Sequence, residues 1–275
     1  MTLPIREFAV SPDVQRVVFV SFRDPTAYGG HLYLLTVATG KVERLTHGYY
    51  LDGLPEPGNP EVYADPDLSP DGRRVVFAIH GQANGDVVEA SGPLAMLDLS
   101  TRRVRILKAT MNVDVGGAAF ANNPHWSPDG NRILVNFENG AAVTEVTGTT
   151  LKNLDGMIPE GEGDLRFALG WVGRGCVLYM VGNTWDKARQ GPKRVLNLRT
   201  RKTEAADRVI PPQMQGGLVV FSPGMVVRTD GNQHVVVEGT RNQFKPWIIP
   251  GDEKTTTVRI LSSPDEDKWL PESCK

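Results

Sequence analysis

Short apolar stretches recur along the chain, each followed by a cluster of turn-forming residues and then by a second apolar stretch. Residues 74–78 are typical: they are rich in β-branched and aromatic residues and too short for a buried helix. Residues 31–37 alternate with a period of two, turn at 38–41 and return at 42–46, and residues 94–107 repeat this second hairpin. Each unit therefore predicts four antiparallel strands.

The turn within the first hairpin is the clearest repeated motif. Ser69 and Ser127 each begin a Ser-Pro-Asp-Gly turn, and Ser11 begins a weaker Ser-Pro-Asp copy; the three serines are spaced by 58 residues. Proline fixes φ at the first central position, aspartate bonds back to the turn backbone, and glycine accepts a positive φ. Repetition at such a period indicates a solenoid, a propeller or an array.

Further copies of the unit follow with less regular turns. Trp171 occupies the position of Trp126, and Val-Gly-Arg-Gly replaces the turn after it. A fifth copy is placed at 225–237, and a sixth begins at residue 263, shortly before the last residue. The six predicted turns lie near residues 11–13, 69–72, 127–130, 172–175, 228–231 and 263–265.

This combination of an aromatic or apolar residue, Ser-Pro-Asp-Gly, a basic residue and an apolar strand resembles the TolB-like (PD40, WD40-like) β-propeller repeat. The resemblance implies an all-β fold, with residues 1–275 forming a single propeller of five or six four-stranded blades, the last of them incomplete. Members of the family include periplasmic TolB and the propellers that precede the catalytic domain of prolyl-oligopeptidase-type peptidases. Folds of this kind carry many functions, so the resemblance implies no reaction.

Composition and charge exclude few functions. The 29 glycines and 20 prolines among 275 residues suit strands and tight turns. A net charge of −2 gives no electrostatic reason to expect nucleic acid or an anionic membrane. No apolar run reaches the roughly 18 residues of a membrane-spanning helix. The first residues lack a signal-peptide pattern, which favours a cytoplasmic protein, whereas the family resemblance favours a mature or trimmed periplasmic one.

The two cysteines are interpreted separately. Cys176 lies in an apolar strand and is expected to be a buried core thiol, and Cys274, the penultimate residue, is expected to be exposed. Nothing in their spacing supports a disulfide framework or a zinc site.

Residues that recur once per unit are assigned structural roles. Asp71 and Asp129 are expected to close their turns, and Trp126 and Trp171 are expected to pack between blades. Basic residues follow the turns in register and are expected to pair with turn carboxylates: Arg16, Arg74 and Arg132. The sequence contains no Gly-x-Ser-x-Gly nucleophile elbow, no His-Glu-x-x-His and no phosphate-binding glycine loop, so no catalytic residues are predicted.

Specificity is expected in the long segments before the second, third and fourth units, at 48–64, 111–123 and 155–164. Each precedes an innermost strand, so all should meet at one mouth of the channel. Tyrosines on loops bury a large area at small entropic cost, and polar side chains at the strand starts could face the channel. The candidate binding residues are Tyr49, Tyr50, Tyr63, Asp67, Asn122, Asn123 and His125. The alternatives are that the tyrosines pack on blade edges and that the polar residues line a wet channel.

The predicted function is that of a non-catalytic binding or scaffold protein without a cofactor or metal. It would recognise a protein or peptide partner through the channel-mouth loops, and a small polar ligand in the channel is a further candidate. Two alternatives remain open: a metal-dependent propeller enzyme of the polysaccharide lyase or hydrolase type, and the propeller fragment of a prolyl-oligopeptidase-like peptidase. A bound metal with at least two histidine ligands would favour the enzyme.

Overall fold

The structure is a computed structural model, and its description covers most of the chain in separate segments. These are residues 5–11, 15–21, 30–46, 62–83, 86–107, 122–137, 140–146, 151–153, 165–182, 192–209, 220–222, 225–229, 235–239, 247–249, 256–261 and 272–274.

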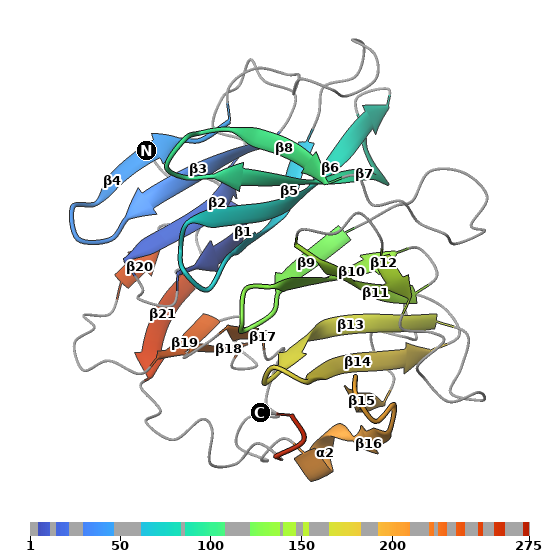
Figure 1. Ribbon diagram of the computed structural model, residues 1–275. Coiled ribbons are helices and arrows are strands. Elements are labelled where there is room, and N and C mark those ends of the chain that lie inside the picture. Colours follow the sequence, from blue (N-terminus) through green and yellow to red (C-terminus); the bar gives the residue numbers. More distant parts are fainter. Residues whose placement is uncertain are drawn as a thin grey trace.

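The described strands form five sheets that follow one another in chain order around a common centre (Figure 1). Sheet 1 contains β1 (Ile5–Val10), β2 (Arg16–Ser21), β3 (His31–Thr36) and β4 (Lys41–Arg44). Sheet 2 contains β5 (Val62–Leu68), β6 (Arg74–Ala83), β7 (Asp86–Asp98) and β8 (Val104–Leu107). Sheet 3 contains β9 (Asn122–Trp126), β10 (Arg132–Phe137), β11 (Gly140–Glu145) and β12 (Leu151–Asn153). Sheet 4 contains β13 (Leu165–Val172), β14 (Cys176–Gly182), β15 (Lys193–Asn197) and β16 (Thr203–Ala205), followed by the short helix α2 (Ala206–Val209).

Sheets 1 to 4 are antiparallel meanders, and their first strands lie side by side: β1 packs beside β5, β5 beside β9, and β9 beside β13. The all-β prediction is confirmed, as are the two hairpins per unit. The strand pairs predicted around 31–46 and 94–107 are β3 with β4 and β7 with β8. The shortened turn at 172–175 also lies where the repeat places it, because Val172 pairs with Cys176 across it.

Sheet 5 differs from the repeat. It contains β17 (Val220–Ser222), β18 (Met225–Thr229), β19 (Val235–Gly239), β21 (Thr256–Leu261) and β20 (Trp247–Ile249), in this spatial order, with β21 parallel to β19. Ser222 pairs with Met225, so the first hairpin turns between them. The strand pair predicted at 225–237 is β18 with β19, in which Thr229 pairs with Val235. It is the second hairpin of sheet 5, whereas the repeat assigned it as the first. The local sequence Ser-Pro-Gly lacks the aspartate of the repeat, and this shortening shifted the alignment. The sixth turn, predicted at 263–265, lies outside the described residues.

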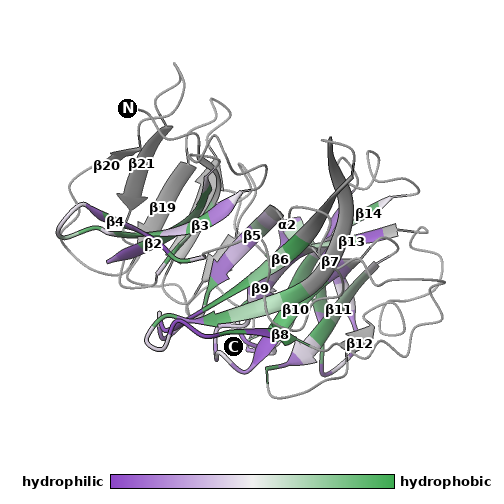
Figure 2. Ribbon diagram, turned by 90° about the horizontal axis from the view of Figure 1, so that it is seen from above, coloured by the Kyte–Doolittle hydropathy of each residue, from purple (hydrophilic) through white to green (hydrophobic). Residues whose placement is uncertain are grey.

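Apolar residues lie within the strands and polar residues in the turns at the strand ends (Figure 2). The apolar side chains of neighbouring sheets pack against one another. Val18 of sheet 1 belongs to the same core cluster as Phe77 of sheet 2. Trp126 packs with Val76 of sheet 2, and Trp171 packs with Leu134 of sheet 3. Both tryptophans are buried, which confirms that they pack between sheets.

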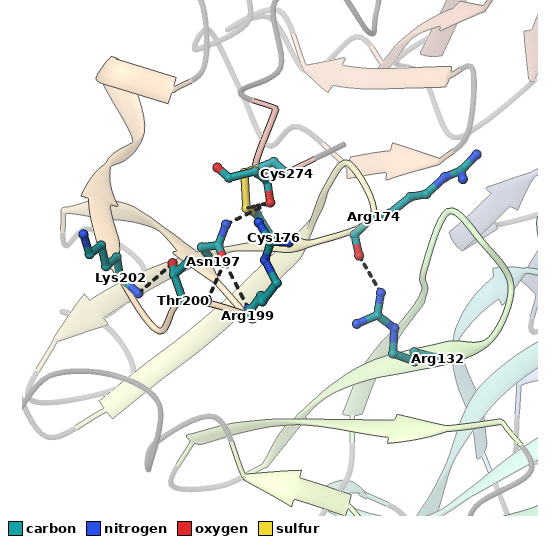
Figure 3. The surroundings of a disulfide bond; sticks show 9 residues. Arg132, Arg174, Cys176, Asn197, Arg199, Thr200, Lys202 and Cys274 are labelled. Carbon is teal, nitrogen blue, oxygen red and sulfur yellow. Dashed lines mark hydrogen bonds between the residues drawn. A yellow bond between two sulfur atoms is a disulfide. The ribbon is translucent and has the colours of Figure 1, made fainter.

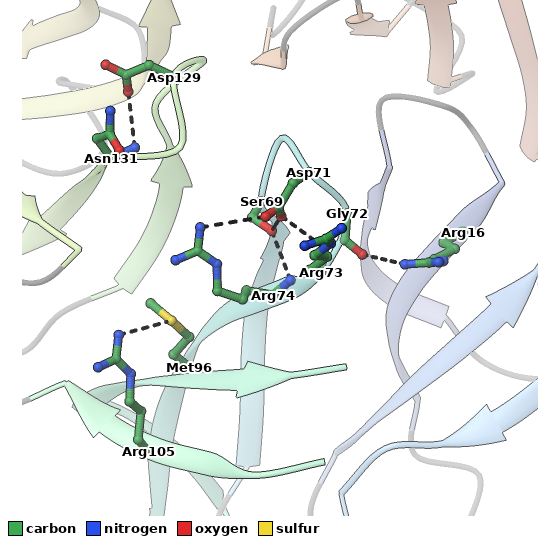
Figure 4. Close-up of polar contacts among 10 residues, drawn as sticks. All are labelled: Arg16, Ser69, Asp71, Gly72, Arg73, Arg74, Met96, Arg105, Asp129 and Asn131. Atoms are coloured by element: carbon green, nitrogen blue, oxygen red, sulfur yellow. Dashed lines mark hydrogen bonds and ion pairs between the residues drawn. The ribbon is translucent and has the colours of Figure 1, made fainter. Parts of the chain in front are cut away.

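The Ser-Pro-Asp-Gly turns close as predicted. Ser69 Oγ donates to Asp71 Oδ1, which also accepts from Arg73 N at 3.0 Å, and Gly72 has φ +65° (Figure 4). Asp129 accepts from Ser127 Oγ and Asn131 N in the same way, and Gly130 has φ +71°. Partial burial acts to raise the pKa of Asp71, but these two hydrogen bonds and the charge of Arg74 outweigh it and hold the pKa below its usual value. The turn aspartates are therefore structural.

The arginine that begins the second strand links each turn to the next sheet. Arg74 and Arg132 lie 3.9 and 3.7 Å from the carboxylates of Asp71 and Asp129, which confirms the predicted local pairs for these two. Their guanidinium groups also lie over tryptophan rings of the following sheet, at 4.8 and 4.9 Å from the ring centroids. Arg16 donates to the carbonyl of Gly72 in the next turn, at 2.6 Å (Figure 4). The carboxylate of its own turn, Asp13, lies outside the described residues. The repeated basic residue thus joins neighbouring sheets as well as its own turn.

The interpretation of the two cysteines as free thiols is wrong. Cys176 and Cys274 form a disulfide with a Cα–Cα distance of 5.1 Å, across a sequence separation of 98 residues (Figure 3). Cys274 is also buried rather than exposed. Sequence spacing could not reveal the pair, because it depends on the return of residues 272–274 to sheet 4.

Candidate functional site

The strand directions define two faces of the disc. The turns between first and second strands and those between third and fourth strands lie at one face of sheets 1 to 4, because consecutive strands are antiparallel. We refer to this as the turn face. The opposite face, here the loop face, is where the first strands begin. The segments 47–61, 108–121 and 154–164 enter β5, β9 and β13 from that side.

The tyrosine candidates are only partly described. Tyr49 and Tyr50 lie outside the described residues. Tyr63 was predicted to lie on a loop, but it lies in β5 and its side chain is fully buried. Its ring meets Phe77 edge-on at 5.7 Å and His31 at 5.9 Å. Tyr63 therefore contributes to packing between sheets 1 and 2 and is not accessible to a partner.

At the loop face, sheets 2 and 3 are joined through two residues of matched conformation. Asp65 and Asn123 occupy the same repeat position and have φ +50° and +49°, a region that aspartate and asparagine tolerate better than most residues. Asn123 N donates to Asp65 Oδ2 at 2.9 Å. Asn123 therefore shapes the start of β9. The equivalent role of Asp65 was not predicted, although its spacing of 58 residues from Asn123 is visible in the sequence. Of Asn122, only the backbone is described.

Closer to the turn face, Asp67 of sheet 2 bonds to the backbone of sheet 3. Its Oδ2 accepts from Trp126 N at 2.6 Å, and its Oδ1 accepts from Leu68 N at 3.0 Å. Desolvation by the closely packed strands raises the pKa of Asp67 to about 7, against the lowering effect of both donors. The residue as a whole is half-buried, and its carboxylate is the desolvated part.

His125 occupies the position in sheet 3 that corresponds to Asp67 in sheet 2. It is 9% exposed, and burial lowers the pKa of its imidazole to about 4. The ring Nε2 has no hydrogen-bond partner among the described residues, whereas the His125 carbonyl accepts from Trp171 Nε1 at 3.0 Å. The imidazole is therefore neutral at neutral pH, and its Nε2 is itself buried.

The predicted polar residues lie at two different heights along the first strands, one nearer the loop face and one nearer the turn face. His125 was expected to begin an innermost strand, but β9 begins at Asn122 and ends at Trp126, so His125 is its penultimate residue. Asn123 and His125 are two residues apart, which corresponds to about 7 Å along a strand. Asn123 thus belongs to the loop-face end, and Asp67 and His125 belong to the end near the turns.

A further cross-link joins sheets 3 and 4. The fully buried Asn136 of β10 accepts from Ala168 N at 2.7 Å through Oδ1 and donates to Ala168 O at 2.9 Å through Nδ2. A lone polar residue inside an apolar strand is a signal that sequence analysis did not use. Together with the bonds made by Asp65 and Asp67, which join β5 to β9, this pair of bonds joins β10 to β13 and so connects sheets 2, 3 and 4.

The site consists of polar side chains on strands that hydrogen bonds join to their neighbouring sheets. The described residues include no group of three or more His, Cys, Asp or Glu side chains placed to hold a metal ion. The carboxylate of Asp67 has acceptor capacity beyond its two backbone donors, and His125 Nε2 is unoccupied.

Comparison with solved structures identifies the fold of this chain. No family model matches the chain, and no curated protein matches it in sequence. Among solved structures, TolB from Acinetobacter baumannii matches with a TM-score of 0.53 and 19% identity over 86% of this chain. The fold is a β-propeller. An oligogalacturonate lyase solved in complex with manganese matches with a TM-score of 0.50 and 12% identity over 84% of this chain.

These matches show the fold alone. The chain spans about half of the TolB from Acinetobacter baumannii, 52% of its length, and 63% of the lyase. Propellers of this kind therefore include both a TolB and an enzyme. In the part of the chain that the structure describes, no helix is long and apolar enough to cross a membrane.

Proposed function

We propose that this propeller is a non-catalytic binding protein that recognises a protein or peptide partner at its loop face. The observation that carries the proposal is the set of side-chain-to-backbone hydrogen bonds that join sheets 2, 3 and 4. Asp65 bonds to Asn123 N, Asp67 bonds to Trp126 N, and Asn136 bonds to both backbone groups of one residue of sheet 4. Side chains that hold neighbouring strands in this way give a preorganised platform, which lowers the ordering cost of binding.

The chain places its longest inter-strand segments at the edge of this platform. The segments 47–61, 108–121 and 154–164 all lead into first strands at the loop face, in sheets 2, 3 and 4. Connections of this length are uncommon in compact domains and are often functional when present. The turn face carries short turns whose polar groups bond to their own backbone, as in the turn after Ser69. The loop face is therefore the better candidate for recognition.

The resemblance in fold to TolB supports a protein partner. The loop-face segment 47–61 carries Tyr49 and Tyr50, and tyrosines are frequent hot-spot residues in interfaces.

The test compares the two faces. The partner is captured from an extract of the source organism with the immobilised chain, identified, and titrated by calorimetry. Tyr49→Ala/Tyr50→Ala should weaken binding by about 5- to 30-fold, the effect of losing roughly 1–2 kcal/mol at a hot spot. Arg199→Ala changes an exposed residue of the turn face and should leave the affinity unchanged.

Two results would contradict the proposal. Loss of binding in Arg199→Ala, with full affinity in the tyrosine variant, would place recognition on the turn face. Saturable Mn²⁺ binding together with cleavage of an acidic polysaccharide would show a metal-dependent enzyme instead, as in the lyase with the same fold.

A further inference from the structure

The C-terminal segment 272–274 lies against the turn face of sheet 4 (Figure 3). Cys274 is bonded to Cys176 at the start of β14, and its carbonyl accepts from Gly175 N at 3.1 Å. The carbonyl of Ser273 accepts from Asn197 Nδ2 at 2.9 Å. A Cβ at position 175 would lie 3.0 Å from that same carbonyl, so a side chain there would force the segment to shift slightly.

Cys176 occupies the position of the repeated arginine. Arg16, Arg74 and Arg132 are the first residues of β2, β6 and β10, and Cys176 is the first residue of β14. In sheets 1 to 3, that residue reaches the following sheet, as when Arg16 donates to Gly72 O. In sheet 4, the same position instead forms a covalent bond to the C-terminal segment.

A second repeat position is also adapted to this segment. Asp98 and Asn197 both end a third strand and accept two backbone N–H groups of the turn that follows. Only the asparagine has an amide that can donate, and it donates to Ser273 O. Sheet 4 therefore departs from the repeat at the positions that touch residues 272–274.

The chain between these contacts contains the whole of sheet 5. It leaves sheet 4 through α2, whose Ala206 and Val209 pack in one apolar cluster with Cys176 and Cys274. Both ends of the segment 210–271 are thus anchored in the same cluster, and sheet 5 lies between them in the sequence.

We propose that the Cys176–Cys274 disulfide is a redox clasp that holds sheet 5 on the disc and replaces the arginine link at the boundary of sheets 4 and 5. The clasp closes when the two thiols lose two protons and two electrons to the disulfide of an oxidant of the dithiol–disulfide class, which becomes a dithiol. The two cysteines are 0% and 3% exposed, so exchange with an external thiol requires residues 272–274 to lift away first. The clasp closes in an oxidising compartment and opens only slowly under a reductant.

The test follows hydrogen exchange by mass spectrometry in three samples: the oxidised protein, the protein reduced with dithiothreitol and alkylated, and Cys176→Ser/Cys274→Ser. Amides of 220–261 should exchange at least about tenfold faster in the last two samples, while amides of 62–107 and 132–145 keep their protection. Ser100→Ala, an exposed change in a turn of sheet 2, is the control and should match the oxidised protein.

Equal exchange of 220–261 in the oxidised and reduced proteins would overturn the proposal. A uniform increase over all sheets would also overturn it, because the bond would then stabilise the whole fold and not the attachment of sheet 5. If the double-serine variant does not fold, the reduced and alkylated wild-type protein decides between these results.

Discussion

The cross-link between sheets 3 and 4 gives the sharpest prediction for stability. Asn136→Ala removes a fully buried amide and leaves the N–H and the carbonyl of Ala168 without this partner. A buried polar group left unsatisfied costs about 1–3 kcal/mol. For two groups, partly relieved by local adjustment, we expect the free energy of unfolding to fall by about 3 kcal/mol.

Urea denaturation at pH 7 measures this loss of unfolding free energy, and a thermal melt measures the accompanying change in Tm. For a chain of 275 residues, about 3 kcal/mol corresponds to a Tm lower by about 5 °C. The m-value should stay constant, because the surface exposed on unfolding is unchanged. Asn131→Ala is a matched control: Asn131 is exposed, lies five positions earlier, and should change stability by less than about 0.5 kcal/mol.

A second variant separates the hydrogen bonds from the volume of the side chain. Asn136→Asp keeps the shape but replaces the donor to Ala168 O with an acceptor, so it should destabilise at least as much as the alanine variant. A loss below about 0.5 kcal/mol in Asn136→Ala, or a stable Asn136→Asp at pH 7, would refute the view that this amide joins the two sheets.

Four further predictions concern the turns, the buried groups Asp67 and His125, and the C-terminal segment. Gly130→Val should lower stability by about 1–3 kcal/mol in thermal melts because valine is strained at φ +71°, whereas Asp129→Asn keeps the accepting oxygen and should be mild. Burial raises the pKa of Asp67 to about 7, so its contribution to the free energy of unfolding is fully present below the ordinary pKa of 3.8 and is lost as the pH rises through 7. In denaturation curves measured over a series of pH values, Asp67→Asn should remove this loss. Because the pKa of His125 is lowered to about 4, stability is lost as the pH falls from 6.5 through 4, and His125→Gln should flatten that part of the series. Asn197→Asp keeps the turn but loses the donor to residue 273, so limited proteolysis should cut the C-terminal segment faster than in the wild type, and an unchanged rate would contradict the docking contact.

The fold was accessible from the sequence where the repeat is regular. The turns that begin at Ser69 and Ser127 define which residues pair in the first hairpins of sheets 2 and 3. Because the units repeat every 58 residues, the position of the second hairpin in each unit follows from the first. In sheet 5 the strand pair at 225–237 was found but assigned to the wrong place in the unit, because the first hairpin, in which Ser222 pairs with Met225, lacks the repeat motif. Local turn chemistry is therefore informative only while the turn keeps its length.

The candidate site was less accessible, because it depends on contacts between sheets. Tyr63 looks like a loop tyrosine in sequence, but the antiparallel pairing of β5 with β6 extends to it and buries it against Phe77. Asp65 and Asn136 owe their roles to backbone groups of the following sheet, which no local pattern reveals. The disulfide likewise joins residues 98 positions apart, so only the folded chain brings the two thiols together.

Recognition at the loop face is the central claim, and selective blocking of each face tests it most directly. The described cysteines are both in the disulfide, so a single introduced cysteine can carry a bulky maleimide–polyethylene glycol label. Tyr50→Cys places the label in the loop-face segment 47–61, and Arg73→Cys places it at an exposed position of the turn face. Labelling at residue 50 should abolish binding of the captured partner, and labelling at residue 73 should leave its Kd within about twofold of the unlabelled protein. Full binding with the label at residue 50 and loss of binding with the label at residue 73 would contradict the account.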